Sequence, residues 1–456
     1  MQRNLTRGSV PQELFHFALP LFLANLLQTF YNIADMMVVG RLIGSAAIVA
    51  VSNATRICFL INSLCNGVTM GGCVVAAHCA GAENKQALKR CVSSLFILSG
   101  AGSIIIMAAC YSTYSALFRL IQVPEESLAQ ARIYFVIFTM GIPFFFGYNA
   151  VCAILRGTGD SKSPLLFISI TSVINIVLDI VLVGPLRMGI AGAALATALS
   201  QGAAFGMAMV LFLKRFPQLR KNEPADSGVP EISDNTEGIG RTIWIILKTG
   251  LPLTLQMTVL NISYLIIAGL FNSYGVAEAA AAGIGLKIST MEVMPCWAVG
   301  QAVTTMAGQN AGAGETERVR KTARAGVLFS LIITGFIMIL IQVFPRLIMK
   351  GFTSSPDVIE KGVIYLRICC SANVLLYAVM YTLDSFATGL GDSVFAMANS
   401  LWHSVGMRLL LSWFFSLQLG LGFTGLCLGE GLSPIISCIA GCVYFYSGRW
   451  KKKKLI

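Results

Sequence analysis

Apolar residues run along most of this chain in long, unbroken stretches that are separated by short polar connections. A helix needs about 20 apolar residues to cross the hydrocarbon core of a bilayer, and these stretches are near that length. Because the stretches are continuous rather than alternating, they predict helices and not the strands of a membrane barrel. We expect twelve spans, at 13–39, 47–77, 91–118, 128–155, 163–184, 189–213, 242–271, 278–309, 323–348, 358–388, 394–418 and 422–447.

The composition agrees with a membrane protein. Of the 456 residues, 56% are hydrophobic and only 12% are charged, whereas soluble proteins carry about 25% charged residues. The net charge of +12 does not indicate nucleic acid, because Lys and Arg lie in the short connections, where the topology of a membrane protein explains them. The thirteen cysteines lie mostly inside apolar stretches and show no zinc or disulfide spacing.

A polar linker divides the chain into two lobes. We expect residues 1–213 to form one lobe with spans 1–6, residues 214–241 a cytoplasmic linker, and residues 242–456 a second lobe with spans 7–12 and a basic C-terminal tail. With both termini inside, about 22 Lys and Arg lie on the inner side against about 8 outside, which is the bias that membrane topology follows. The N-terminus has no cleavable signal pattern. We therefore expect a multi-pass protein of the cell membrane with both termini cytoplasmic.

The two lobes repeat each other. A Leu-Pro-Leu sequence at 19–21 recurs at 251–253, and the Gly-x-Gly-Asp pattern at 157–160 recurs at 389–392. Since each lobe has six spans, both begin on the same side of the membrane, and the repeat is parallel. The expected fold is an all-α integral membrane protein, with twelve transmembrane helices in two parallel-repeat six-helix bundles around a central cavity. Rocking one bundle against the other would give alternating access, which favours a transporter.

Acidic residues inside the spans are the first functional candidates, because charge in a membrane is costly. Asp35 shares one helix face with Gln28 and Tyr31, and Asn175 lies one turn before Asp179. Such a carboxyl pair could hold a proton or bind Na⁺ through its oxygens, and release either when the cavity opens. For Asp35 alone, the alternative is a carboxylate that faces interfacial water near a helix end.

Pro20 lies in the same span as Asp35 and predicts a kink. The kink could be static, or it could change with the protonation of Asp35. Under the repeat, Asp35 and Asp179 have no acidic counterpart in the second lobe, so the coupling acids are confined to the first lobe.

Other charged residues in the second lobe have less definite roles. Lys287 and Glu292 are nearly one turn apart and could pair with each other. Asp384, His403 and Arg408 could either line the cavity or lock helices together.

No enzymatic constellation stands out along the chain. A nucleotide-binding loop, a zinc-site spacing and a nucleophile elbow are all missing. We therefore expect no enzyme and no cofactor, and active transport must draw on an ion gradient, which supplies about 2.3 kcal/mol per charge per 100 mV.

The chain resembles the multidrug and toxic compound extrusion (MATE) family. The stretches at 19–41, 155–160, 175–179 and 189–197 carry the resemblance. It implies a twelve-helix exporter of small-molecule drugs or organic cations, driven by H⁺ or Na⁺, with no nucleic-acid partner. We expect a monomer in the lipid bilayer.

The acid placement resembles the DinF-like branch of that family. This implies that Asp35 couples transport, that Asn175, Asp179 and Thr197 form the cation site with it, and that Asn149 lies nearby. The NorM-like branch also has an acid in its seventh span, but residues 251–271 contain none, which puts a second cation site in doubt.

The expected function is a multidrug efflux antiporter that works by rocker-switch alternating access. Its expected substrate-cavity residues are Gln28, Tyr31, Asn149 and Met257. The alternative is a flippase of the same superfamily for lipids or lipid-linked precursors. Few basic residues lie within the spans, which disfavours that alternative.

Overall fold

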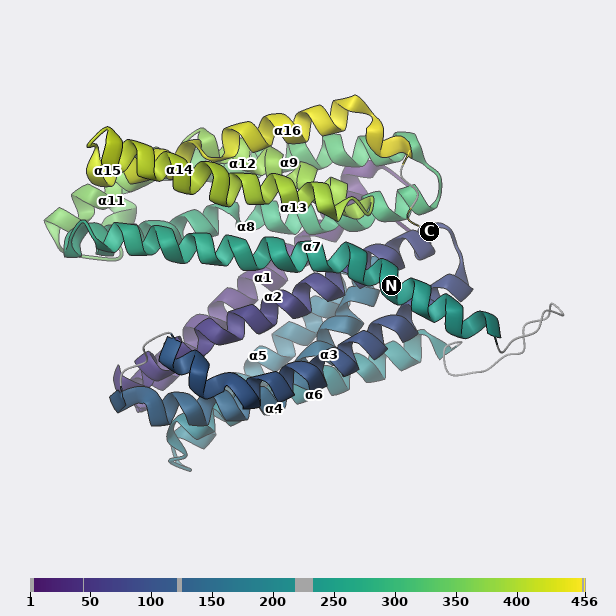
Figure 1. Ribbon diagram of the computed structural model, residues 1–456, viewed down its shortest axis with the longest axis horizontal. Helices are drawn as coiled ribbons and strands as arrows, with labels where there is room; N and C mark the ends of the chain where they lie inside the picture. Colours follow the sequence, from purple (N-terminus) through teal and green to yellow (C-terminus); the bar gives the residue numbers. More distant parts are fainter. Residues whose placement is uncertain (1–3, 44, 121–124, 218–232, 453–454, 456) are drawn as a thin grey trace. The chain divides into compact units, whose positions relative to one another are not determined.

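The computed structural model describes residues 4–43, 45–120, 125–217, 233–452 and 455, and these residues fold into helices and their connections. Figure 1 shows the order of the helices along the chain. Their bounds are α1 (Val10–Leu42), α2 (Ser45–Gly81), α3 (Lys85–Leu120), α4 (Glu125–Gly157), α5 (Lys162–Val183), α6 (Gly189–Arg215), α7 (Ser233–Asn272), α8 (Val276–Gly312), α9 (Thr316–Val343), α10 (Pro345–Lys350), α11 (Pro356–Cys369), α12 (Asn373–Gly389), α13 (Ser393–Leu401), η2 (Trp402–Met407), α14 (Arg408–Trp413), η3 (Phe414–Gln418), α15 (Gly422–Leu432), α16 (Pro434–Ser447) and η4 (Arg449–Lys452).

Each expected span falls on helix. Within the described residues, nine helices are long and apolar enough to cross a membrane, and the bent pair α11 and α12, with 51° between its two parts, makes a tenth. The other two expected spans coincide with α8 and with the run from α13 to η3. Polar residues such as Gln301, Gln309 and Asn310 lower the hydropathy of α8, and two π-helical segments, η2 and η3, interrupt the second run.

The chain divides into two compact units whose borders lie inside helices. Unit 1 contains residues 23–251, and unit 2 contains residues 5–22 together with 252–456. Helices α1 and α7 continue through Pro20 and Pro252, although a proline removes one backbone hydrogen bond from a helix. Both helices therefore pass from one unit to the other beside a proline.

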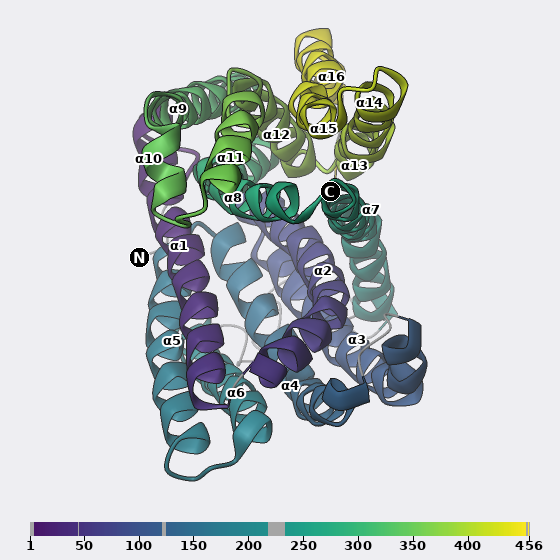
Figure 2. The ribbon, with the colours of Figure 1, turned by 90° about the vertical axis from the view of Figure 1, so that its left-hand side faces the viewer.

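Unit 1 is built around α4, which packs against α2, α3 and α6, while α5 packs against α6. Its core includes Cys65, Phe118, Phe135 and Ile142, all nearly fully buried. Figure 2 shows the part of α1 that belongs to this unit together with α5 and α6. That half, α5 and α6 position the acidic residues described below.

Unit 2 is built around α8 and α12, which pack against each other and against α9. The first residues of the chain join this core, since Leu14 and Phe17 pack in the same cluster as Met306 and Phe386. Hydrogen bonds also hold the segment before α1, because Arg318 donates through Nη1 to the backbone oxygen of Gly8 at 2.8 Å.

The repeated Gly-x-Gly-Asp motif makes the same kind of turn in each unit. Gly159 and Gly391 have φ of +89° and +81°, a conformation that favours glycine. The following Asp160 accepts a hydrogen bond from Ser163 N at 3.0 Å in the first turn of α5, and it forms an ion pair with Arg215 of α6.

The counterpart of Asp160 in unit 2 also contacts the last long helix of its unit. Asp392 accepts a hydrogen bond from the hydroxyl of Tyr444 in α16 at 3.0 Å. In each unit, the aspartate of the repeated motif therefore connects the loop before one helix (α5 or α13) to the last long helix of the unit (α6 or α16).

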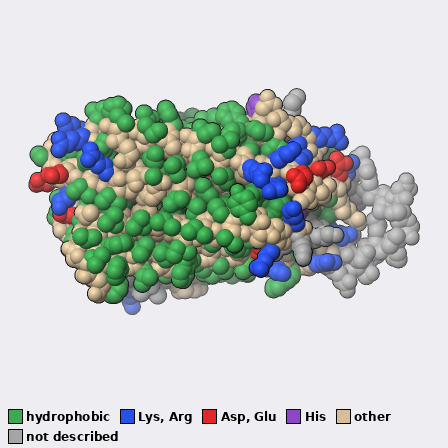
Figure 3. All heavy atoms as spheres, turned by 90° about the horizontal axis from the view of Figure 1, so that it is seen from above, with side chains coloured by type: hydrophobic (Ala, Val, Ile, Leu, Met, Phe, Trp, Pro, Cys, Tyr) green, Lys and Arg blue, Asp and Glu red, His purple; other side chains and the backbone are tan. Residues whose placement is uncertain are grey.

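Hydrophobic side chains cover the middle of the face shown in Figure 3, and Lys and Arg gather toward its ends. Large apolar residues such as Val173, Ile332 and Phe336 are more than half exposed. A soluble protein rarely exposes an apolar surface of this extent, so the exposed apolar side chains of both units suit contact with lipid.

Candidate functional site

Two acids from separate transmembrane helices meet in unit 1. Asp35 of α1 and Asp179 of α5 lie close enough for their side chains to share a hydrogen bond. Asp179 is fully buried, and the Oδ1 atoms of both acids have no hydrogen-bond partner among the described residues. Two carboxyls can share a hydrogen bond only when one of them carries a proton, so a proton bound between them would satisfy this contact.

An amide and a hydroxyl complete the polar surroundings of the pair. With the nitrogen of the Asn175 amide facing Asp179, Nδ2 donates to Asp179 Oδ2 at 2.8 Å and Oδ1 accepts from Thr197 N at 3.3 Å. The side chain of Tyr31 forms a hydrogen bond with that of Thr197. Helices α1, α5 and α6 thus each contribute polar side chains to one cluster.

The cluster offers the ligands that small hard cations prefer. The carboxylates of Asp35 and Asp179 and the Thr197 hydroxyl supply oxygen atoms, which suit Na⁺ better than nitrogen or sulfur does, whereas the Asn175 amide turns its nitrogen toward Asp179. The unpartnered Oδ1 atoms are acceptors that either a cation or a proton could satisfy. The residues present therefore fit both a proton and Na⁺.

The remaining predicted site residues do not join this hydrogen-bonded cluster. Gln28 is exposed two turns earlier on α1. The side-chain nitrogen of Asn149 donates to Phe145 O of its own helix at 2.8 Å. Met257 is half-buried on α7 and belongs to unit 2, as does Pro20, which lies within α1.

One further neighbour of the acids is a tyrosine that the sequence pattern does not single out. Tyr134 of α4 is buried in unit 1 and interacts electrostatically with Asp35, Asp179 and Tyr31. A tyrosine in an apolar stretch carries no signal that separates it from ordinary core residues. Only a comparison of α4 with the face of α1 that carries Asp35 could have found it.

The suggested pairing of Lys287 with Glu292 is wrong. Lys287 is exposed, whereas Glu292 is fully buried, and no ion pair joins them in the described part of the chain. The physical reason is the spacing, since five residues turn an α-helix by about 140° and place the two side chains on different faces.

Asp384 and the pair His403 and Arg408 turn out to have different environments. Asp384 accepts a hydrogen bond from Asn399 Nδ2 at 2.8 Å, and the same nitrogen donates to Ser437 O at 3.1 Å. This network ties α12, α13 and α16 together. His403 and Arg408 instead line a pocket within unit 2.

Comparisons with known proteins agree with this fold. The MatE family model matches residues 20–181 and 252–414, one segment from each half of the chain. The probable multidrug resistance protein YpnP of Bacillus subtilis is 31% identical over 454 residues, which cover 99% of this chain and 98% of that protein.

Solved structures show the same arrangement of helices. An outward-facing multidrug resistance MATE family transporter of the MOP superfamily superposes with a TM-score of 0.88 at 22% identity, covering 99% of this chain and 98% of that one. A mutant of the Vibrio cholerae MATE transporter VcmN superposes with a TM-score of 0.87 at 20% identity, covering 96% and 97%. The expected all-helical membrane fold is therefore confirmed.

Proposed function

The chain belongs to the MatE family and is a multi-pass membrane transporter rather than an enzyme, and we propose that it exports amphipathic, mostly cationic compounds in exchange for H⁺ or Na⁺. The similarity to YpnP, named a probable multidrug resistance protein, supports drug export. The contact between Asp35 and Asp179 carries the proposal of coupling.

The carboxyl pair can couple the movement of the ion to the movement of the drug, because a buried pair accommodates little net charge. Two ionised carboxylates in contact repel each other and are poorly solvated when buried, so the doubly ionised pair must attract a cation. A proton or Na⁺ that binds the doubly ionised pair cancels one of its two negative charges and weakens its attraction for a cationic drug. When the drug binds instead, the coupling ion is displaced, and this mutual exclusion is the requirement for antiport.

The position of Asp35 connects this chemistry to conformation. Asp35 and Tyr31 lie on the part of α1 that belongs to unit 1, whereas residues 10–22 of the same helix belong to unit 2. A change in the contacts of Asp35 with α5 therefore acts on a helix that both units share. Pro20 lies within two residues of the border and supplies a place where α1 could bend.

Several features favour the DinF-like branch and an orientation with both termini in the cytoplasm. The seventh span has no acid between residues 251 and 271, and basic residues concentrate in the segments assigned to the inside. With this orientation, substrate leaves the cytoplasm while the coupling ion enters through unit 1. We further propose that the protein acts as a monomer in the cell membrane, with a substrate cavity that includes Gln28, Tyr31, Asn149 and Met257.

Substitution of Asp35 tests the proposed function. Efflux of a fluorescent organic cation would be followed in cells that lack their own exporters, with wild-type protein and Asp35→Asn at equal expression. We expect the variant to reach the membrane and to lose at least about tenfold in efflux rate, because the pair no longer titrates. Asp357→Asn, which neutralises an exposed acid in the first turn of α11, should keep wild-type efflux. Wild-type efflux in Asp35→Asn would refute the proposal.

A further inference from the structure

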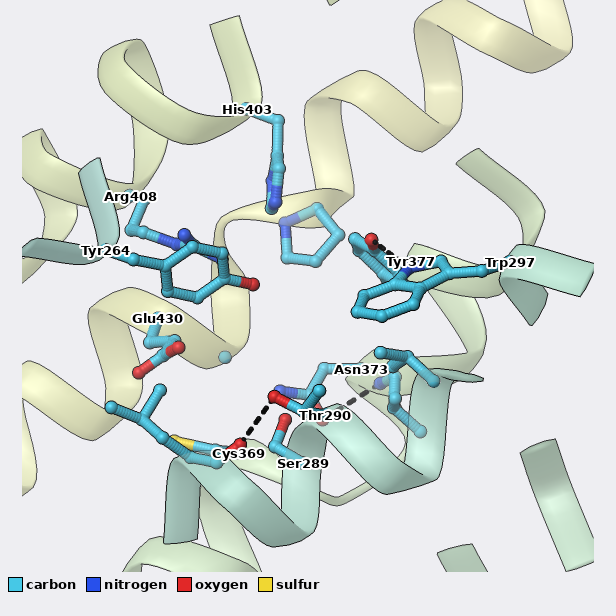
Figure 4. A pocket seen from close by; sticks show the side chains of 15 residues that line it. Tyr264, Ser289, Thr290, Trp297, Cys369, Asn373, Tyr377, His403, Arg408 and Glu430 are labelled. Carbon is cyan, nitrogen blue, oxygen red and sulfur yellow. Dashed lines mark hydrogen bonds between the residues drawn. The ribbon is translucent and has the colours of Figure 1, made fainter. Parts of the chain in front are cut away.

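Unit 2 contains a pocket that the coupling site does not explain. Residues from α7, α8, α11, α12, η2, α14, α15 and α16 line it. Figure 4 shows Arg408 and Tyr264 on one side of this space and Trp297 and Tyr377 on the other, with His403 above and Ser289 below. Every lining residue belongs to unit 2.

Arg408 is the most unusual residue of this pocket. Only 4% of its surface is exposed, and its guanidinium lies 4.2 Å from the centre of the Tyr264 ring. Its Nε and Nη1 atoms have no hydrogen-bond partner among the described residues. Buried cationic donors without acceptors are costly, so an acceptor that enters the pocket would be bound strongly.

The acid nearest to this charge leaves those donors free. Glu430 lines the same pocket and attracts Arg408 electrostatically, but the two form no ion pair within the described part of the chain. Glu430 Oε2 instead accepts a hydrogen bond from the hydroxyl of Tyr365 at 3.3 Å. The pocket therefore contains a guanidinium with available donors and a carboxylate that forms no ion pair with it.

The other walls suit a planar apolar group. Trp297 donates a hydrogen bond to the hydroxyl of Tyr377 at 3.2 Å, which fixes both rings. The ring of His403 lies 5.9 Å from that of Tyr377 and interacts with the backbone of Ser433. Aromatic rings bind planar ligands through stacking and edge contacts.

We propose that this pocket is a binding site for the carboxylate group of an aromatic compound, with Arg408 as the residue that holds the carboxylate. A guanidinium donates strong, charge-assisted hydrogen bonds to a carboxylate, and Nε and Nη1, which lie on different edges of the Arg408 guanidinium, are both unpartnered donors among the described residues. Trp297 and Tyr377 contact the aromatic part, and Glu430 disfavours a second negative charge. The site differs in charge from the acidic cluster of unit 1, and the proposal does not depend on ion-coupled export.

Equilibrium binding to the purified full-length protein tests the site without any gradient. Tryptophan fluorescence would be titrated with benzoate, benzylammonium and benzyl alcohol at constant ionic strength, with Trp297→Phe to identify the signal that comes from the pocket. We expect benzoate to bind at least about tenfold more tightly than the other two compounds, since only benzoate offers the guanidinium a negatively charged acceptor. Tighter binding of benzylammonium than of benzoate would overturn the proposal.

Two variants that change the charge of the pocket in opposite directions make the test specific. Arg408→Gln should weaken benzoate binding about tenfold or more and leave benzyl alcohol unchanged, whereas Glu430→Gln should strengthen benzoate binding by removing a repelling charge. Lys287→Gln removes an exposed cation of α8 and serves as the matched control.

Unchanged benzoate affinity in Arg408→Gln would refute the site. If that variant fails to fold, weaker benzoate binding in Glu430→Gln would refute it instead. Asp35→Asn should bind benzoate normally, which separates this result from failure of the coupling site.

Discussion

Asp35 of α1 and Asp179 of α5 lie with their carboxyls against each other, and within the described residues neither acid forms an ion pair with Lys or Arg. A lone pair of acids in transmembrane helices has no structural advantage over apolar residues, because burial of charge is costly. The proposed binding and release of a cation would give this pair of acids a role.

The two acids should act as a single unit. Asp179→Asn is expected to lower efflux about as far as Asp35→Asn does, and the double variant should be no worse than either single one, because loss of one member already removes the shared site. Efflux rates of the three variants at equal membrane abundance would be compared in a double-mutant cycle. Additive losses would show that the acids act independently.

Asn175 should matter through its contact with Asp179. Asn175→Ala removes the donor that lies 2.8 Å from Asp179 Oδ2, and loss of a buried hydrogen bond to a charged group costs about 1–3 kcal/mol. We expect efflux to fall about tenfold while folded protein is still produced. Ser169→Ala, on the same helix with its hydroxyl bonded to Leu165 O, provides the control. An Asn175→Ala variant as active as Ser169→Ala would contradict this role.

Two repeated glycines should tolerate no side chain. A Cβ at Gly157 would lie 2.7 Å from Cys73 O, and one at Gly389 would lie 3.0 Å from Thr304 Cα. Gly157→Leu and Gly389→Leu should each cost about 1–3 kcal/mol or more, because close-packed helices must separate.

Thermal unfolding, followed by size-exclusion chromatography after heating, measures this cost. Gly206→Leu is the matched control, since no atom lies within 4 Å of a Cβ at Gly206. Equal thermal stability of the Gly157 and Gly206 variants would show that the close approach is not required.

The ion pair between Asp160 and Arg215 should contribute more stability than the corresponding hydrogen bond between Tyr444 and Asp392 in unit 2. Asp160 is 1% exposed and both pairs with Arg215 and binds the first turn of α5, whereas Tyr444 gives Asp392 one hydrogen bond. Asp160→Asn should lower the free energy of unfolding by about 1–3 kcal/mol and Tyr444→Phe by about 1 kcal/mol. The apparent melting temperatures of the two variants check this order. A larger drop in melting temperature for Tyr444→Phe than for Asp160→Asn would contradict the prediction.

Hydropathy and the repeat predicted the helices well because lipid leaves a membrane chain few alternatives. The polar faces around Asp35 and Asp179 could also be predicted, since helical spacing fixes which residues share a face. Two features depend on tertiary packing and could not be read from the sequence. The first is the division of α1 between two units near Pro20, and the second is the pairing of Arg408 with the ring of Tyr264 rather than with an acid.

The central claim is that the Asp35–Asp179 pair exchanges a cation for drug. Purified protein in lipid vesicles would be supplied with a pH gradient or a Na⁺ gradient, each applied separately, while movement of a fluorescent organic cation is recorded. The account predicts that at least one of the two gradients drives transport against the concentration gradient of the dye, and that Asp35→Asn abolishes this transport. Equal dye movement with and without the gradients, or gradient-driven movement that persists in Asp35→Asn, would contradict it.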